Sequence, residues 1–156
     1  MGLKPQLVWM DKPTAALRDW RPAHPLLLGY IEMRHRILII DDEDDIREIA
    51  AMSLESVAGW EVMVANSGAQ GLVHAASYKP DAILLDVMMP GMDGPSTFRE
   101  LRSNPVTARI PVLFLTAKVQ ASDRQRFAGI GVEAVLVKPF DPLTLSNQIA
   151  SALGWN

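Results

Sequence analysis

The sequence predicts an α/β protein with a doubly wound parallel sheet of five strands and five helices. Three observations lead to this prediction. Short apolar runs alternate with segments of helical periodicity, the links between them are short, and four of the apolar runs end in polar groups. Successive parallel strands need right-handed crossovers, so the helices should cover both faces of the sheet.

The composition is that of one globular domain. The chain has 156 residues, of which 49% are hydrophobic and 21% are charged, so it can bury a sizeable core. A formal net charge of -3 gives no reason to expect nucleic acid or a membrane as a partner, and no apolar run is long enough to span a bilayer. The absence of cysteine excludes disulfides, thiolate metal sites and cysteine nucleophiles. We therefore expect a cytoplasmic protein.

The N-terminal residues 1–34 differ from the rest of the chain. They contain four prolines, with Trp9 and Trp20 scattered among charges, and they keep no helical or strand period. We expect an irregular tail followed by a domain over residues 35–156. The tail is either a docking arm that binds a partner through its tryptophans, or a segment without a role that precedes the true start at Met33.

The first strand and helix follow this tail. Residues 36–40 form an apolar run that is typical of a strand buried on both faces, and the acidic run 41–45 comes directly after it. Negative charges suit the positive end of the helix that begins there and ends at Gly59. Six residues mark the helical spacing: Ile46, Ile49, Ala50, Ser53, Leu54 and Val57.

The next elements are a strand, a helix and a strand that ends in a carboxylate. Residues 60–65 alternate in polarity, which favours a strand nearer an edge, and Ser67 should cap the second helix. That helix stops before Lys79, and its apolar positions are Ala69, Leu72, Val73 and Ala76. Residues 82–86 form an apolar run that ends in a single carboxylate, Asp86.

Two strands and the third and fifth helices lie in the second half of the chain. Phe98 and Leu101 should face inward from the third helix. Residues 110–116 and 132–138 are predicted strands, and Asp141 followed by proline is a strong start signal for the fifth helix. The residues expected to pack that last helix are Leu145, Ile149, Ala152 and Leu153.

The fourth helix has the weakest apolar face. Ser122 or Asp123 should cap it, and Phe127 is nearly its only large apolar residue. Since most helical stability comes from packing an apolar face, we expect this helix to be the most loosely held.

Polar side chains gather at the carboxyl ends of the strands. They are Asp41, Asp42, Asp86, Thr116 and Lys138. Carboxyl ends of parallel strands meet at one edge of a sheet, so these groups should lie close together. Three adjacent carboxylates repel unless a cation lies among them, and oxygen ligands without Cys or His select a hard ion such as Mg²⁺. With an ammonium and a hydroxyl beside it, this site suits a phosphoryl group, and a carboxylate can itself form an aspartyl phosphate.

This arrangement resembles the receiver domain of two-component response regulators, in a single-domain form like the chemotaxis receivers. The matching motifs are Asp41-Asp42, residues 86–94, Thr116-Ala117 and residues 138–140, each after its own strand. The resemblance runs from about His35 to Leu153. It implies the flavodoxin-like fold with strand order 2-1-3-4-5.

The resemblance also implies a role for each matching residue. Asp86 would be phosphorylated and would bind Mg²⁺ together with Asp42, with Asp41 through water, and with the backbone carbonyl of Met88. Lys138 would pair with Asp86 at rest and with the phosphoryl group afterwards.

On the phosphoryl side of the site, Thr116 and the backbone amide of Ala117 would hydrogen-bond the phosphoryl oxygens. The peptide bond between Lys138 and Pro139 is expected to be cis, as in many relatives. Where the family commonly has an aromatic switch residue, this chain has Val135, which is too short and too stiff at χ1 to swing in the same way.

Met88 and Lys118 flank the path that the attacking water takes in the family. We hypothesise that the bulk of Met88 slows loss of the phosphoryl group.

The leading functional hypothesis is a stand-alone receiver rather than an enzyme. It would accept a phosphoryl group from a histidine kinase or a histidine phosphotransfer protein and would signal to an unknown downstream protein as a monomer or weak dimer. The family places kinase contacts on the first helix, here around Ile46, Arg47 and Ala50, and the output on the face of the fourth helix, fifth strand and fifth helix.

Two other functions stay open. A haloacid-dehalogenase-like phosphatase uses the same residue types in this order, but its nucleophile lies on the first strand. A receiver-like binding module that is never phosphorylated is the third possibility, and Val135 keeps it open.

Overall fold

The computed structural model describes residues 34–117 and 119–155. The predicted tail, apart from Arg34, and the expectation about Lys118 lie outside these residues. Within the described part of the chain, no helix is long and apolar enough to cross a membrane.

Five parallel strands form one sheet, in the order β2-β1-β3-β4-β5. This confirms the predicted fold class and strand order. The strands are β1 (Arg36–Ile40), β2 (Glu61–Ala65), β3 (Ala82–Asp86), β4 (Val112–Thr116) and β5 (Ala134–Val137). The first three match the prediction to within a residue. Strand β4 begins two residues later than predicted, and β5 begins two residues later and ends one residue earlier. The three central strands are almost entirely buried, which is why they appear in the sequence as unbroken apolar runs.

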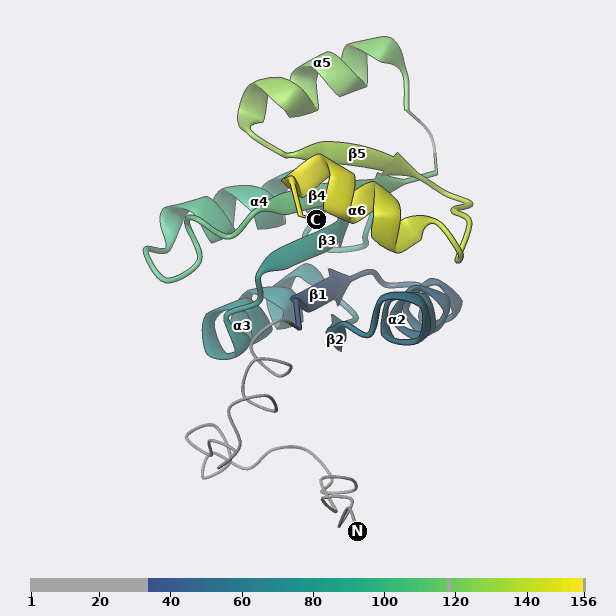
Figure 1. Ribbon diagram of the computed structural model, residues 1–156. Helices are drawn as coiled ribbons and strands as arrows, with labels where there is room; N and C mark the ends of the chain where they lie inside the picture. The colour runs from purple at the N-terminus through teal and green to yellow at the C-terminus, as the bar shows by residue number, and fades with distance from the viewer. Residues whose placement is uncertain (1–33, 118, 156) are drawn as a thin grey trace, which may run out of the picture. The chain divides into compact units, whose positions relative to one another are not determined.

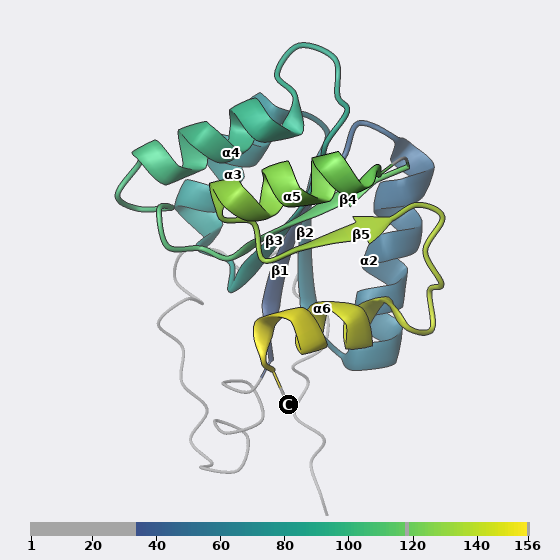
Figure 2. The same ribbon diagram turned by 90° about the horizontal axis from the view of Figure 1, so that it is seen from above.

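The helices lie on both faces of the sheet (Figure 1, Figure 2). In the described residues they are α2 (Asp44–Ala58), α3 (Gly68–Tyr78), α4 (Gly94–Ser103), α5 (Ala121–Ile130) and α6 (Leu145–Leu153). Helices α3, α4 and α5 pack on one face, and α2 and α6 pack on the other. Strands β2 and β5 are therefore the edges, and the carboxyl ends of β1 and β3 lie side by side at the centre.

Each face has its own hydrophobic core. Under α3, α4 and α5, the buried rings of Phe98, Phe114 and Phe127 meet edge to face, with centroids 6.0 and 4.9 Å apart. Under α2 and α6, Leu54 and Ile149 pack against the odd-numbered residues of β1. The alternating side chains of a strand point to opposite faces, so one apolar run supplies both cores.

Two helices bury different residues from those that mark their period in the sequence. In α2, Ile49 and Val57 are exposed, although both fit the helical spacing. In α3 the buried face is made by Gly71, Ala75 and Tyr78, while Val73 is 66% exposed. The reason in α3 is close packing: a Cβ on Gly71 would lie 2.4 Å from Ile40 Cδ1, so the smallest residue faces the sheet.

Three helix starts test the capping predictions. Ser67 caps α3, because its side chain accepts a hydrogen bond from the Gln70 N–H, as predicted. The cap of α5 is Gln120 and not Ser122 or Asp123, since Asp123 turns back and its carboxylate accepts from the Gln120 N–H. Asp141 begins a turn that leads into α6, which itself starts four residues later at Leu145.

An aromatic cluster closes the end of the sheet opposite to Asp86. His35 stacks on Trp155 with ring centroids 3.8 Å apart, and Trp60 meets both rings edge to face. His35 precedes β1, Trp60 precedes β2 and Trp155 follows α6, so the cluster joins the amino ends of two strands to the end of the last helix.

Candidate phosphoryl and metal site

The sheet brings the predicted polar residues to one edge. Asp41 and Asp42 follow β1, Asp86 ends β3, Thr116 ends β4 and Lys138 follows β5. Because these four strands are neighbours in the sheet and run in parallel, their carboxyl ends share one rim.

Three carboxylates meet at this rim. One oxygen from each of Asp41, Asp42 and Asp86 lies within 4.8 Å of the other two. Asp41 is fully buried and Asp86 is 3% exposed, while Asp42 is more accessible. Two carboxylates are thus held out of water beside each other, an arrangement that costs free energy unless positive charge compensates it.

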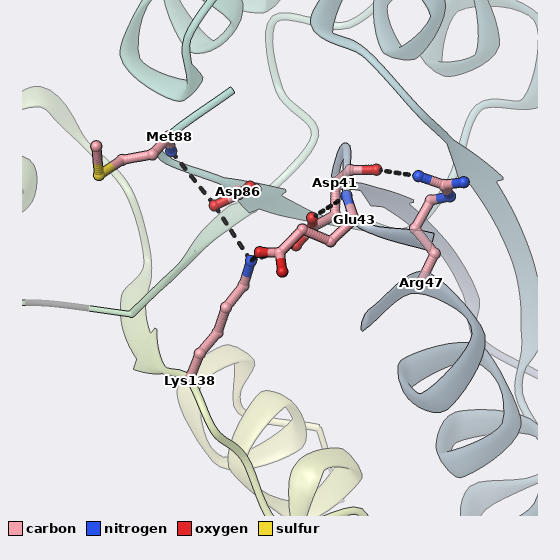
Figure 3. Close-up of polar contacts among 6 residues, drawn as sticks. All are labelled: Asp41, Glu43, Arg47, Asp86, Met88 and Lys138. Atoms are coloured by element: carbon pink, nitrogen blue, oxygen red, sulfur yellow. Dashed lines mark hydrogen bonds and ion pairs between the residues drawn. The ribbon is translucent and has the colours of Figure 1, made fainter. Parts of the chain in front are cut away.

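Lys138 supplies part of that positive charge (Figure 3). Its Nζ lies 2.7 Å from Asp41 Oδ2, 3.1 Å from Glu43 Oε1 and 3.5 Å from Asp86 Oδ1. The pairing with Asp86 expected at rest is therefore present, but it is the longest of the three contacts. Glu43 was not among the predicted site residues, and the only sign of it in the sequence is its place in the acidic run 41–45.

Burial and the neighbouring charges shift two pKa values at the site. Burial, and next the charge of Asp41, raise the pKa of Asp86 to about 7, although Lys138 acts in the opposite direction. Burial alone would lower the pKa of Lys138, but the carboxylates of Asp41, Glu43 and Asp86 outweigh it and raise that pKa. The site in this form has more buried negative charge than the lysine alone balances.

The donor set fits a hard divalent cation. It consists of carboxylate oxygens, and Asp41 Oδ2 is buried without a regular hydrogen bond, held only by its ion pair with Lys138. A cation among the three carboxylates would satisfy that oxygen and oppose the repulsion that raises the pKa of Asp86. Mg²⁺ is the ion that this chemistry favours.

The loop after β3 is shaped around Asp86. The Met88 N–H lies 3.3 Å from Asp86 Oδ1, and the Met88 side chain is 76% exposed and extends away from the lysine (Figure 3). It lines a hollow of about 420 Å³ between this loop and α5. Further along, the Asp93 carboxylate accepts a hydrogen bond from the Ser96 N–H and so caps α4.

Gly94 is the tightest point of this loop. A Cβ at this position would lie 2.5 Å from the Asp86 carbonyl oxygen and 2.7 Å from Val87 Cα. The Gly94 N–H also donates to the Val87 carbonyl. Only glycine lets the start of α4 approach the end of β3 so closely, which fixes the backbone on either side of Asp86.

Arg47 hydrogen-bonds the acidic loop that carries Asp41. Its Nη1 donates to the backbone carbonyl of Asp41 at 2.7 Å, and its Nη2 pairs with Asp44. The Arg47 side chain is 15% exposed, and the kinase contact that the family resemblance places near it stays a prediction. Asp44, its ion-pair partner, lies in the first turn of α2 with a side chain that is 87% exposed.

The remaining predicted positions lie where the topology requires. Ala117 directly follows β4 and is exposed, and Val135 is half-buried on β5, opposite Phe114 in the register. The Lys138–Pro139 peptide bond is cis, as expected. Thr116, another of the predicted site residues, is 3% exposed at the end of β4.

This fold and site define a CheY-like α/β domain of the flavodoxin type. The chain belongs to the response regulator receiver domain family, whose sequence pattern residues 37–150 match. Asp86 ends β3, the third strand along the chain. A haloacid-dehalogenase-like phosphatase would instead have its nucleophile on the first strand.

Among curated proteins, the phosphate regulon transcriptional regulatory protein PhoB of Pseudomonas aeruginosa is 38% identical over 117 residues, which are 75% of this chain and 51% of PhoB. The DNA-binding dual master transcriptional regulator RpaA of Synechocystis is 42% identical over 106 residues, which are 68% of this chain and 44% of RpaA. The chain therefore spans about half the length of the curated relatives that it matches.

Solved receiver structures cover the same region. Chemotaxis protein CheY4 of Vibrio cholerae is similar with a TM-score of 0.71 and 31% identity, over 76% of this chain and 98% of CheY4. The N-terminal domain of a response regulator receiver protein from Methanoculleus marisnigri has a TM-score of 0.63 and 32% identity, over 78% and 98% of the two chains.

Proposed function

We propose that this receiver domain accepts a phosphoryl group on Asp86 in a Mg²⁺-dependent reaction and transmits the signal by binding another protein. The observation that supports this most is the convergence of a buried Asp86 with two further carboxylates and the Lys138 ammonium. The donor is a histidine kinase or a histidine phosphotransfer protein, since His35 and His74 do not contact this site in the described residues.

The transfer step is a displacement at phosphorus. A carboxylate oxygen of Asp86 forms a bond to the phosphorus of the partner's phosphohistidine, the P–N bond breaks, and its electron pair stays on the imidazole. Lys138 then neutralises and orients the phosphoryl oxygens, and the Thr116 hydroxyl and the Ala117 amide donate hydrogen bonds to them. Asp41, Asp42, Asp86 and the Met88 carbonyl would hold Mg²⁺, which when bound neutralises charge on the carboxylates and the incoming phosphoryl group.

The phosphoryl group adds close to two negative charges to the rim, which shifts the balance between two conformations of the domain. We infer that the kinase docks on α2 around Ile46 and Arg47, whereas Ala50, also expected there, is fully buried. We also infer that the output face is formed by α5, β5 and α6. The downstream partner is a protein and not nucleic acid or a membrane. The domain acts in the cytoplasm as a monomer or weak dimer.

The test is a labelling experiment. The protein is incubated with Mg²⁺ and acetyl phosphate, and a mass gain of one phosphoryl group is measured for the natural chain and for Asp86→Asn. We expect labelling that disappears in the variant and in the presence of a metal chelator. Labelling that persists in Asp86→Asn would assign the acceptor elsewhere.

A receiver-like module that works without phosphorylation is the second candidate, because Val135 replaces the aromatic residue that relatives use as a reporter. It predicts no labelling in the same assay. A phosphatase would instead turn over a phosphate ester many times, and we propose that this chain does not.

A further inference from the structure

The Lys138 ammonium contacts three carboxylates. One of them, that of Glu43, has no part in the proposed phosphoryl transfer. Glu43 lies 3.1 Å from Nζ, closer than Asp86 at 3.5 Å (Figure 3). We propose that Glu43 is a positioning residue that restrains Lys138 in the unphosphorylated state and so slows phosphorylation of Asp86. This inference rests on the proposed function of Asp86.

The position of Glu43 is fixed by its backbone. Its N–H donates to Asp41 Oδ1 at 2.9 Å, and it is the residue that immediately precedes α2. Its side chain is 60% exposed, whereas that of Lys138 is 8% exposed. The carboxylate therefore reaches the lysine from the solvent side of the rim, while Asp86 lies on its buried side.

Geometry explains why this contact opposes the reaction. An ammonium group has three N–H donors, and its two shortest contacts here are Asp41 at 2.7 Å and Glu43. A phosphoryl group on Asp86 would present its oxygens beyond that carboxylate and would require the ammonium to turn toward them. The Glu43 contact must weaken for this to happen, so it stabilises the state before transfer.

The effect of the contact between Glu43 and Lys138 has to be distinguished from the effect of the negative charge of Glu43. Any carboxylate near the rim repels a phosphoryl donor, whether or not it touches Lys138. Asp45 provides the comparison, because it lies on the first turn of α2, is exposed, and makes no ion pair or side-chain hydrogen bond in the described part of the chain. Asp45→Asn removes the same charge as Glu43→Gln without removing a contact to the lysine.

The first measurement is the rate of labelling by acetyl phosphate at saturating Mg²⁺, with saturation checked for each variant. We expect Glu43→Gln to raise the rate about three- to fivefold and Asp45→Asn to change it less than about twofold. Equal rates for the two variants, or no increase with Glu43→Gln, would overturn the proposal.

The second measurement needs neither metal nor phosphorylation. The ¹H–¹⁵N signal of the Lys138 ammonium is recorded in the metal-free protein at low temperature and assigned by its loss in Lys138→Met. We expect Glu43→Gln to shift or broaden it and Asp45→Asn to leave it in place. An unchanged signal in Glu43→Gln would also overturn the proposal.

The two measurements separate the two ideas. If the natural chain is never labelled, the proposed function fails, and the ammonium signal still reports whether Glu43 holds the lysine. If the natural chain is labelled and Asp86→Asn is not, the function stands, and the ratio of Glu43→Gln to Asp45→Asn decides the role of Glu43.

Discussion

Asp86 is buried, and the proposed function requires its carboxylate to be ionised so that it can act as a nucleophile, two properties that conflict. Burial and the charge of Asp41 raise its pKa to about 7, so near neutral pH a large fraction of the metal-free protein is protonated there. Positive charge near the carboxylates favours the ionised form. If the proposed function is right, proton loss, cation binding and readiness for transfer are coupled at this one side chain.

This coupling predicts a pH dependence of stability. The pKa of Asp86 rises from 3.8 in an unfolded chain to about 7 in the folded one, so the folded protein binds more protons between about pH 4 and 7. The free energy of unfolding should thus fall as the pH rises through this window. Without metal, we expect Asp86→Asn to be more stable than the natural chain at pH 8, by about 1 to 4 kcal/mol, and close to it near pH 4.

Urea unfolding at the two pH values measures this difference. Adding Mg²⁺ at pH 8 serves as the control, because it should stabilise the natural chain and have much less effect on Asp86→Asn. A natural chain that is more stable than the variant at pH 8 without metal would contradict the sign.

Met88 is the residue where we expect the lifetime of the phosphoryl group to be set. Its exposed side chain lines the hollow beside the loop that follows Asp86. Met88→Asn replaces an apolar side chain with one that can hydrogen-bond and orient an attacking water, so dephosphorylation should become roughly threefold faster or more. The decay of labelled protein measures the rate, and Met52→Asn, the same change at an exposed site on α2, should leave it unchanged.

At the scale of elements, the junction of β3 and α4 should be intolerant of any side chain. Gly94→Ala places a Cβ against the Asp86 carbonyl, a backbone atom that cannot turn aside. We expect a loss of about 1 to 3 kcal/mol in the free energy of unfolding, together with slower labelling of Asp86. Thermal and urea unfolding measure the first effect and the acetyl phosphate assay the second.

Gly129 offers the matched comparison. It lies inside α5, and a Cβ there meets no atom within 4 Å. Gly129→Ala should therefore leave stability unchanged or raise it by about 0.5 to 1 kcal/mol, because alanine favours a helix interior. If both alanine variants behave alike, close approach at Gly94 is not the reason for its presence.

Helix α5 buries a single side chain against the sheet. Phe127 is its only buried side chain and packs edge to face on Phe114, two residues before Thr116. Because Val135 cannot supply a moving ring, we expect displacement of this helix to be the response that follows phosphorylation. Few buried contacts also imply low local stability.

Hydrogen exchange tests that expectation. Amides of α5 should exchange faster than those of the other helices in the natural chain. Phe127→Ala should bring them close to unprotected rates and lower global stability by about 3 kcal/mol. Ile130→Ala, on the same helix but 44% exposed, should have little effect. Protection in α5 equal to that in α2 would contradict the idea.

At the scale of the whole molecule, the fold could be predicted because its central strands are buried on both faces. An unbroken apolar run followed by a carboxylate identifies both the strand and its functional end, as residues 36–41 and 82–86 show. The convergence of Asp41, Asp86 and Lys138 could be predicted because each lies at the carboxyl end of a parallel strand. Their roles in phosphoryl transfer stay predictions.

What the sequence could not predict depends on contacts between distant segments. Val73 fits the period of α3 yet faces solvent, because Gly71 is the residue that lets the helix approach Ile40. Glu43 looks like one more helix-start acid until β5 brings Lys138 beside it. Arg47 likewise gains its role only when the loop folds back under its guanidinium.

The cluster of aromatic rings formed by His35, Trp60 and Trp155 has a practical consequence for spectroscopy. These chromophores lie at the amino ends of the strands, and Asp86 lies at the carboxyl ends. Once Trp9 and Trp20 are replaced by phenylalanine, the fluorescence should follow unfolding and remain the same when Asp86 is modified. Folding can then be monitored in a phosphorylated sample without interference, whereas a fluorescent reporter of signalling has to be introduced at the opposite rim.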